Sequence, residues 1–250
     1  MTASKFNQHS RIYKYATENL YALDMLDIEN KKVLTIAGSG DHLIEFYRRG
    51  AQYVTVFDIN QNTQNWIDYK LACLNKYEKL ADFITTLNRQ TLVNFTAHIH
   101  EHIRTIIPYL KDEDSYQYTK QMLKSKISTY ICTDITHLRT SINNEKFDII
   151  YLSNIADYSH LMFDSEDHVN QFIDVCVRPL LNNLNKNGSM VPAYIYDANN
   201  KHDSDKRNIL NCEQYRSSAY KSLNIASYHE YRIQSAIDPT TEDRVLILKP

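Results

Sequence analysis

The chain of 250 residues is poor in glycine, in paired cysteines and in long apolar runs. It holds only four glycines, and none lies between Glu78 and Lys126, so this stretch predicts helices joined by short turns. The four cysteines lie far apart and include no C-x-x-C pair: Cys73, Cys132, Cys176 and Cys212. This spacing indicates neither a disulfide framework nor a zinc site, and it favours a reducing compartment.

Charge and hydropathy exclude further classes. The net charge is −2 and no block of like charges occurs, so a nucleic-acid groove is not indicated. No apolar run approaches the roughly 20 residues of a membrane span, and the N-terminal residues lack the apolar core of a secretory signal. We therefore expect a cytoplasmic protein without a transmembrane segment. Residues 1–250, 43% of them hydrophobic, suffice for one globular domain.

One stretch, residues 31–60, organises the rest and reads KKVLTIAGSGDHLIEFYRRGAQYVTVFDIN. An apolar run rich in β-branched residues ends in the glycine turn Gly38-Ser39-Gly40, and a helical pattern follows. A second apolar run ends at Asp58, at about the distance where a βαβ unit places a carboxylate beside a bound ribose. This layout predicts a nucleoside-cofactor site.

The residues after the glycine turn bear on the identity of that cofactor. A nicotinamide dinucleotide site would have a third glycine near position 43, whereas the chain has Asp41, His42 and Leu43 there. The Asp41 carboxylate would also repel a pyrophosphate. A cofactor with a cationic centre and no phosphate is the better electrostatic match, which favours S-adenosylmethionine.

The run VLTIAGSGDHL and its continuation to LACL resembles the first motifs of the class I methyltransferase fold. More closely, it resembles the 3-amino-3-carboxypropyltransferases that make betaine lipids from S-adenosylmethionine and diacylglycerol. Gly40-Asp41 matches the Gly-Asp after that family's first strand, and Asp58-Ile59-Asn60 matches its Asp-x-Asn. Residues 69–72 resemble its Leu-Lys-Leu-Ala segment. Residues 154–158 resemble its later Asp-Trp motif, with Tyr158 in place of tryptophan.

The resemblance implies an α/β, Rossmann-like class I methyltransferase fold, with a mostly parallel sheet that ends in a C-terminal antiparallel hairpin. About 70 residues separate Asp58 from Thr129, more than one crossover helix needs, so a helical insertion is predicted over about 78–127. We expect this insertion to bind the acceptor or to form a homodimer contact.

Periodicity and turn residues predict the other elements. A helix over 10–26 would carry Tyr13, Tyr15 and Tyr21, which could either cover the cofactor or pack on the sheet. Strands are predicted over 128–134, 146–152, 189–196, 228–234 and 244–248, with Pro192 at a bulge or an edge. A further helix is predicted over 169–184, stopped by Asn187-Gly188.

Site residues follow from the same resemblance and from the strand ends. The cofactor is expected to contact the glycine turn and Asp41 at its methionine end, the end of the second strand at its ribose, and the end of the third strand at its adenine. These cofactor-binding candidates are Gly38, Ser39, Gly40, Asp41, Asp58, Ile59, Asn60, Asp134, Ile135 and Asn154. Asp134 could instead cap the turn that follows it.

Acceptor chemistry is assigned to Asp157 and Tyr158, which would orient the acceptor or remove its proton, with His160 as a weaker general base. Asp157 could instead cap the following helix. The sulfonium of S-adenosylmethionine makes three attached carbons electrophilic, so either a methyl or a 3-amino-3-carboxypropyl group could be transferred to a small-molecule or lipid acceptor. A non-catalytic S-adenosylmethionine-binding module and, less favoured, a nicotinamide-dependent oxidoreductase remain alternatives.

One metal motif stands apart. His98, Glu101 and His102 spell H-x-x-E-H, the signature of inverted zinc peptidases. The sequence offers no recognisable third ligand, so we interpret the match as fortuitous and expect no metal.

Overall fold

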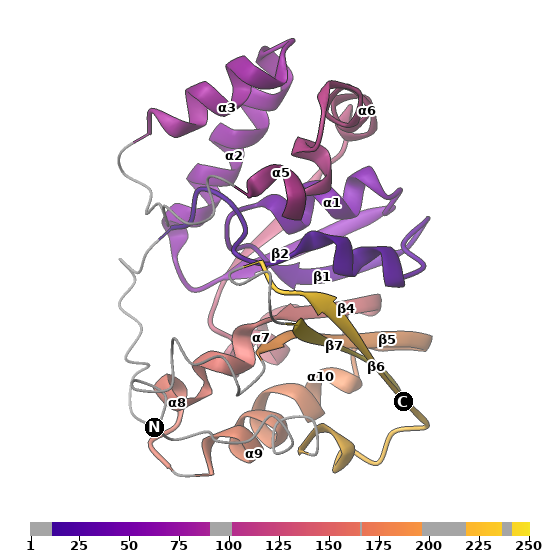
Figure 1. Ribbon diagram of the computed structural model, residues 1–250. Coiled ribbons are helices and arrows are strands. Elements are labelled where there is room, and N and C mark those ends of the chain that lie inside the picture. Colours follow the sequence, from indigo (N-terminus) through magenta and orange to yellow (C-terminus); the bar gives the residue numbers. More distant parts are fainter. Residues whose placement is uncertain (1–11, 91–101, 166, 197–218, 237–241) are drawn as a thin grey trace. The chain divides into compact units, whose positions relative to one another are not determined.

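The computed structural model describes residues 12–90, 102–165, 167–196, 219–236 and 242–250 (Figure 1). These residues fall into two compact units, divided between Asp134 and Ile135. We call them the N-terminal unit and the C-terminal unit. A single domain over residues 1–250 remains a prediction.

Three parallel strands form the centre of the N-terminal unit: β1 (Lys32–Ile36), β2 (Tyr53–Asp58) and β3 (Ser128–Cys132). Their order is β3-β2-β1, with Val33 paired to Val54 and Asp58 paired to Cys132. The β-branched and aromatic residues of these runs favour extended backbone and fill the core. Because the strands are parallel, their carboxyl ends meet at one edge, where the glycine turn and Asp58 lie.

In sequence, helices precede β1 and connect the three strands (Figure 1). They are η1 (Leu20–Met25), α1 (Asp41–Arg48), α2 (Gln61–Lys76), α3 (Leu80–Asn88), α5 (Ile103–Ile106), η2 (Pro108–Leu110) and α6 (Glu113–Leu123). The last four confirm the predicted helical insertion between β2 and β3. Aromatic rings hold it together, since the Phe83 centroid lies 5.4 Å from that of Tyr116 and 6.4 Å from that of Tyr109.

The C-terminal unit has four strands, β4 (Phe147–Ser153), β5 (Leu184–Tyr196), β6 (Ser227–Gln234) and β7 (Glu242–Lys249), in the order β4-β5-β7-β6. Strand β4 is parallel to β5, and β7 is antiparallel to both of its neighbours. Its helical elements are α7 (Ile135–Ile142), η3 (Ile155–Tyr158), α8 (Ser159–Met162), α9 (His168–Phe172), the π-helical turn η4 (Ile173–Val177) and α10 (Arg178–Leu181).

The predicted fold class is therefore confirmed as an α/β, Rossmann-like fold with mostly parallel strands, a helical insertion and a closing antiparallel hairpin. The predicted bulge at Pro192 is confirmed as well, because the pairing of β5 with β4 shifts register between Tyr151 and Ser153. A bulge lets a proline occupy a strand that has a neighbour on each side.

Two predicted elements need correction. The helix predicted over 10–26 is wrong within the described residues, where only the 3₁₀ helix η1 forms. Backbone groups of Lys14 and Ala16 bond to side chains of other elements instead of to each other. The Asn187-Gly188 pair lies inside β5 and does not stop a helix, since the preceding helix already ends at Leu181 and β5 begins at Leu184.

The turn between β1 and α1 depends on its two glycines for different reasons. Both have positive φ, 49° at Gly38 and 85° at Gly40. A Cβ added at Gly40 would lie 3.0 Å from Cγ1 of Ile67 in α2, whereas a Cβ at Gly38 would meet nothing within 4 Å. Gly40 therefore allows α2 to pack against the turn, and Gly38 leaves open space on its side.

This difference predicts unequal costs for two alanine substitutions. Gly38→Ala should lower the free energy of unfolding by about 1 to 2 kcal/mol, the cost of left-handed backbone alone. Gly40→Ala should cost about 1 to 3 kcal/mol more, because Ile67 must move. Urea denaturation measures both. In an Ile67→Ala background the two costs should converge, and an undiminished gap there would contradict the packing argument.

Candidate functional site

Asp58 joins three parts of the edge at which the N-terminal strands end. One carboxylate oxygen accepts a hydrogen bond from the Gly38 N–H at 3.2 Å, and the other accepts from the Asn60 N–H at 2.9 Å. Burial raises the pKa of Asp58, and these hydrogen bonds act in the opposite direction. Asn60 in turn caps α2 through the Asn62 N–H. The glycine turn and the start of α2 are therefore held by one half-buried carboxylate.

The end of β3 lies beside the same carboxylate. The Thr133 N–H donates to the Asp58 carbonyl at 2.9 Å, and the Tyr130 hydroxyl donates to the Asn60 carbonyl at 2.7 Å. Asp134 follows at the end of the N-terminal unit and is half-buried. The structure thus brings together the ribose candidates and the end of β3, as the parallel strand order predicts.

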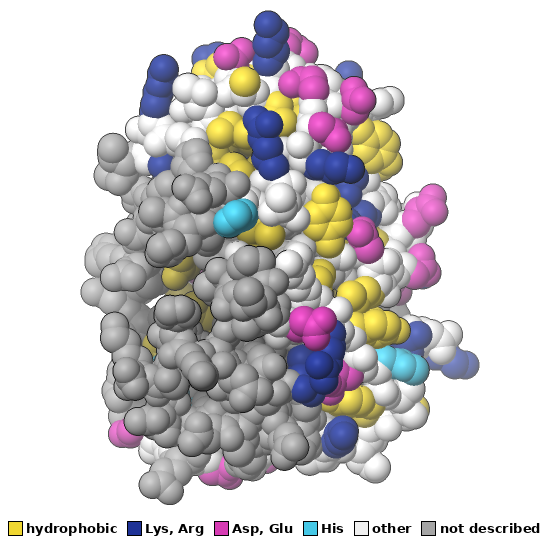
Figure 2. Space-filling model, in the orientation of Figure 1, with side chains coloured by type: hydrophobic (Ala, Val, Ile, Leu, Met, Phe, Trp, Pro, Cys, Tyr) yellow, Lys and Arg dark blue, Asp and Glu magenta, His cyan; other side chains and the backbone are white. Residues whose placement is uncertain are grey.

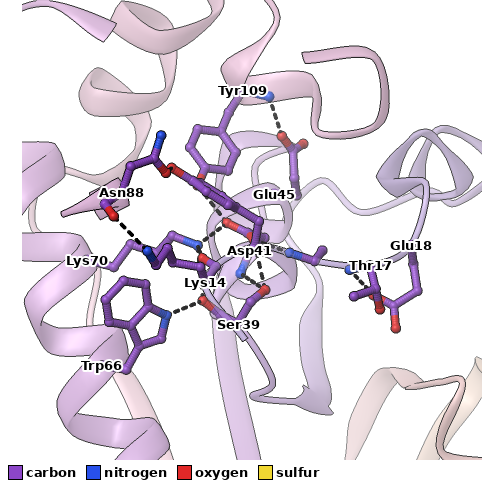
Figure 3. A network of polar contacts seen from close by, with 12 residues as sticks. Lys14, Thr17, Glu18, Ser39, Asp41, Glu45, Trp66, Lys70, Asn88 and Tyr109 are labelled. Carbon is purple, nitrogen blue, oxygen red and sulfur yellow. Dashed lines mark hydrogen bonds and ion pairs between the residues drawn. The ribbon is translucent and has the colours of Figure 1, made fainter. Parts of the chain in front are cut away.

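Asp41 is fully buried beneath the glycine turn (Figure 3). Lys70 Nζ lies 2.5 Å from Oδ1, and the Tyr109 hydroxyl donates to the same oxygen at 2.6 Å. The other oxygen accepts from the Ala16 N–H at 2.6 Å and from the Ser39 hydroxyl at 2.8 Å. Both oxygens therefore bind donors of the protein, and the Lys70 ammonium neutralises the charge.

A second buried carboxylate, Glu45, lies one turn along α1. It forms ion pairs with Arg48 and Arg49, and it accepts a hydrogen bond from the Tyr109 N–H at 2.7 Å. Burial raises its pKa, while the two arginines lower it. Tyr109 thus contacts both carboxylates of α1, through its hydroxyl and through its backbone. These contacts fasten the helical insertion to the helix that follows the glycine turn.

Lys14 and Tyr15, in the segment before η1, contact the residues around Asp41 and Lys70 (Figure 3). Lys14 donates to the Asn88 carbonyl at 2.9 Å, and the Tyr15 hydroxyl donates to the Asn88 side chain at 3.1 Å. Tyr15 is buried, and the Lys70 ammonium lies 5.1 Å from its ring centroid. Of the two roles considered for this tyrosine, packing is the one that these contacts support.

Sequence reasoning missed Lys70, Tyr109 and Glu45. A signal for Glu45 exists, since its i,i+4 spacing from Asp41 places both carboxylates on one face of α1. Lys70 falls in the segment that resembles Leu-Lys-Leu-Ala, but a lysine on a helix is ordinarily exposed. Tyr109 is one of nineteen tyrosines and carries no local signal.

In the C-terminal unit, the acceptor candidates follow β4. Ser153 at the end of β4 has a positive φ of 50°, which turns the chain sharply into η3. Asp157 and Tyr158 are half-buried, whereas His160 is exposed and its Nδ1 donates to the Asp157 carbonyl at 2.9 Å. Tyr158 is the N-cap of α8 and its own side chain makes no capping hydrogen bond, and the two roles considered for Asp157 both stay predictions.

Asp243, near the start of β7, is a carboxyl that sequence reasoning missed. It pairs with Tyr196 at the end of β5, and only 1% of its surface is exposed. Burial raises its pKa to about 7, and the negative charge of Asp157 adds to this rise, while a hydrogen bond from Ser235 opposes it. The C-terminal unit therefore holds a carboxyl that titrates near neutral pH within the electrostatic reach of Asp157.

The remaining expectations concern metals, membranes and charge. His98 and Glu101 lie outside the described residues, and His102 is an exposed residue that precedes α5. Among the described residues no three His, Cys, Asp or Glu side chains gather as metal ligands. No helix in the described part of the chain is long and apolar enough to cross a membrane. Figure 2 shows basic and acidic side chains interspersed over the described surface of one face.

Comparison with known proteins found likeness at the level of structure. No protein-family model matches the chain. No curated protein matches it either. An O-methyltransferase family protein from Burkholderia thailandensis is 11% identical, with a TM-score of 0.49, over 91% of this chain and 54% of that one.

Two further solved structures are similar. The magnesium protoporphyrin IX methyltransferase of Synechocystis PCC 6803, solved with bound SAM, is 8% identical, with a TM-score of 0.48, over 92% of this chain and 75% of that one. An rRNA methyltransferase from Streptomyces viridochromogenes is 12% identical, with a TM-score of 0.46, over 92% of this chain and 80% of that one. The chain spans about half the length of the Burkholderia protein. At these identities and TM-scores, function must be argued from the chain's own residues.

The raised pKa of Asp243 predicts a pH dependence of stability. Folding raises this pKa from 3.8 to about 7, so between these values the folded state binds more protons than the unfolded state. The free energy of unfolding should therefore fall as the pH rises through this window. Asp243→Asn cannot ionise and should gain about 2 to 4 kcal/mol relative to wild type between pH 4 and pH 8.

Urea denaturation at the two pH values measures this gain. Glu242→Gln, at the exposed neighbouring position, is the matched control and should show little pH-dependent difference from wild type. An Asp243→Asn effect of equal size at both pH values would contradict the assignment.

Proposed function

We propose that the chain is an S-adenosylmethionine-dependent transferase that moves a methyl or a 3-amino-3-carboxypropyl group to a small-molecule or lipid acceptor. The observation that carries this proposal is the arrangement at the edge of the N-terminal unit. There Asp58 ends β2 and binds the Gly38 N–H, next to the open space on the Cβ side of Gly38. A carboxylate beside an open glycine turn is the arrangement that recognises the ribose of a nucleoside cofactor.

A cofactor with a pyrophosphate fits this site less well than one without, although the charge of Asp41 is not the reason. Because Lys70 neutralises Asp41, the charge of Asp41 no longer repels a phosphate. The position where a dinucleotide site would have a third glycine is Leu43, which is completely buried in the core. A leucine there keeps the helix from packing on the strand as closely as the third glycine of a dinucleotide site allows. The residues present therefore fit a cofactor without phosphate better.

Each proposed contact is assigned within its own unit. In the N-terminal unit, the glycine turn and Asp41 serve the methionine end, residues 58–60 serve the ribose, and Asp134 serves the adenine. In the C-terminal unit, Ile135 and Asn154 are assigned to the cofactor. Asp41 would act from beneath the turn, because its oxygens already bind protein donors.

When bound, S-adenosylmethionine supplies a sulfonium whose attached carbons are electrophilic. The protein's part is to hold an acceptor in line and to accept the proton that the acceptor loses when its new bond to carbon forms. We assign acceptor orientation to Tyr158 and proton acceptance to Asp157, with His160 as an exposed secondary base. The resemblance at Gly40-Asp41 and residues 58–60 makes the 3-amino-3-carboxypropyl group one candidate for the group transferred, beside a methyl group, and a lipid one candidate acceptor, beside a small molecule. Acceptor binding or dimerisation through the helical insertion also remains a proposal.

Cofactor binding tests the ribose assignment. Asp58→Ala should weaken the binding of S-adenosylmethionine by about 1 to 3 kcal/mol, the worth of hydrogen bonds to a charged acceptor. Isothermal titration calorimetry measures the affinity, and thermal unfolding confirms that the variant is folded. Asp68→Ala, at an exposed position of α2, is the matched control and should bind like wild type. Unchanged affinity in a folded Asp58→Ala protein would remove Asp58 from the site.

The reaction product separates the alternatives. After incubation with a cell extract, methylthioadenosine indicates aminocarboxypropyl transfer, and adenosylhomocysteine indicates methyl transfer. Binding without either product would favour a non-catalytic module. Binding of a reduced nicotinamide cofactor in place of S-adenosylmethionine would favour an oxidoreductase.

Turnover tests the acceptor side. Asp157→Asn should leave the affinity for S-adenosylmethionine unchanged and lower the rate of product formation by about 100-fold or more, since a positioned base contributes about that much. Mass spectrometry of the products measures the rate. Asp164→Asn, at an exposed position in the same unit, is the control. If Asp157→Asn weakened binding as much as turnover, its role would be structural.

A further inference from the structure

Lys70 is a completely buried lysine in the middle of α2. Its ammonium lies 2.8 Å from the Lys14 carbonyl, 3.1 Å from the Ser39 carbonyl and 2.5 Å from Asp41 Oδ1 (Figure 3). An ammonium has three N–H donors, and each has its own acceptor here. These acceptors belong to the segment before η1, to the glycine turn and to the first residue of α1. One side chain of α2 therefore joins the segment before η1 to the continuous stretch from the glycine turn to the start of α1, and these two parts are distant in sequence.

The Ser39 carbonyl is held by α2 twice. Trp66, one helical turn before Lys70, donates its indole N–H to the same oxygen at 3.1 Å. On the other side of that peptide, the Gly40 N–H donates to the Ala37 carbonyl at 2.8 Å. The peptide between Ser39 and Gly40 is thus fixed at both ends, and with it the direction in which the glycine turn faces.

We propose that Lys70 is a positioning residue for the S-adenosylmethionine site, which holds the glycine turn in its binding conformation through the Ser39 carbonyl and Asp41. This inference rests on the proposed function. Lys70 touches the turn from the side of α2, whereas the open space lies on the Cβ side of Gly38. Lys70 acts through the turn and is not assigned a contact with the cofactor.

Burial explains why a lysine is suited to this position. Desolvation lowers the pKa of Lys70 and the charge of Asp41 raises it, so the neighbouring carboxylate favours the ammonium form of this lysine. The ammonium also lies 5.8 Å from the Trp66 ring centroid. A neutral side chain in place of Lys70 would leave no unbalanced charge if residue 41 were neutral too. A methionine at position 70, however, could not donate a hydrogen bond to the Ser39 carbonyl.

That difference separates positioning from mere stabilisation. Lys70→Met alone leaves Asp41 as an uncompensated buried charge and should unfold readily. The double variant Lys70→Met with Asp41→Asn restores neutrality, so its melting temperature should return close to that of wild type. Its affinity for S-adenosylmethionine should nevertheless stay at least tenfold weaker, measured by calorimetry. Lys76→Met, at an exposed position of the same helix, is the control and should bind like wild type.

A second variant keeps the inference testable if the double variant does not fold. Trp66→Phe removes the second donor to the Ser39 carbonyl and leaves the ion pair with Asp41 intact. It should weaken binding severalfold, and the smaller ring at this buried position should lower the melting temperature modestly. Wild-type affinity in the folded double variant, or in Trp66→Phe, would overturn the positioning role.

Amide hydrogen exchange separates this inference from the proposed function. Measured without cofactor, the Gly40 amide should exchange faster than in wild type in each folded variant, because the turn loses an anchor. The Ala16 amide should exchange faster in the double variant alone, because only there the segment before η1 loses its bond to Lys70. Unchanged exchange would overturn the inference even if the wild-type protein binds S-adenosylmethionine. If wild type does not bind it, the proposed function fails, and exchange alone decides whether Lys70 fixes the turn.

Discussion

The N-terminal unit depends on a buried ion pair between Asp41 and Lys70. Removing a carboxylate and an ammonium from water is costly, and their attraction compensates only when the remaining donors and acceptors are also bonded. Here they are, since Asp41 accepts from Tyr109, Ser39 and Ala16 as well. The pair therefore requires the glycine turn, the helical insertion and the segment before η1 to be in place together. None of these parts could satisfy the two charges alone.

The contacts of this ion pair also distinguish Asp41 from Asp58, the other carboxylate proposed to serve the cofactor. Asp58 ends β2 and Asp41 begins α1, and the sequence assigns Asp58 to the ribose and Asp41 to the methionine end of the cofactor. Asp41 is compensated by Lys70 and bonded on both oxygens within the protein. Asp58 is half-buried, and its two oxygens accept hydrogen bonds from the Gly38 and Asn60 N–H groups at the edge where the strands end. The two carboxylates differ because one supports the turn and the other lies at its opening.

The sequence predicts those features that local chemistry determines. Runs of β-branched residues, two glycines with positive φ and an aspartate at a strand end are each visible within a few residues, and the fold class follows from them. The prediction of a helix over 10–26 rested on the helical spacing of its apolar residues, and it was wrong. Within the described residues, backbone groups of this segment form hydrogen bonds with the side chains of Asp41 and Lys70, which lie elsewhere in the chain. The role of Lys70 could not be predicted, because its burial depends on contacts with residues that are distant in sequence.

In the C-terminal unit, too, one carboxyl could be predicted from neighbouring residues and another could not. Asp157 could be predicted because it follows the strong strand β4, where parallel sheets carry their ligands. Asp243 could not, because it matters only through the pairing of β7 with the end of β5, which brings it to the same strand ends. Its raised pKa and its influence on Asp157 are consequences of that pairing. A carboxyl that gains or loses a proton near neutral pH changes the charge beside Asp157, and so its basicity. The proton acceptance assigned to Asp157 should therefore be considered together with the protonation of Asp243.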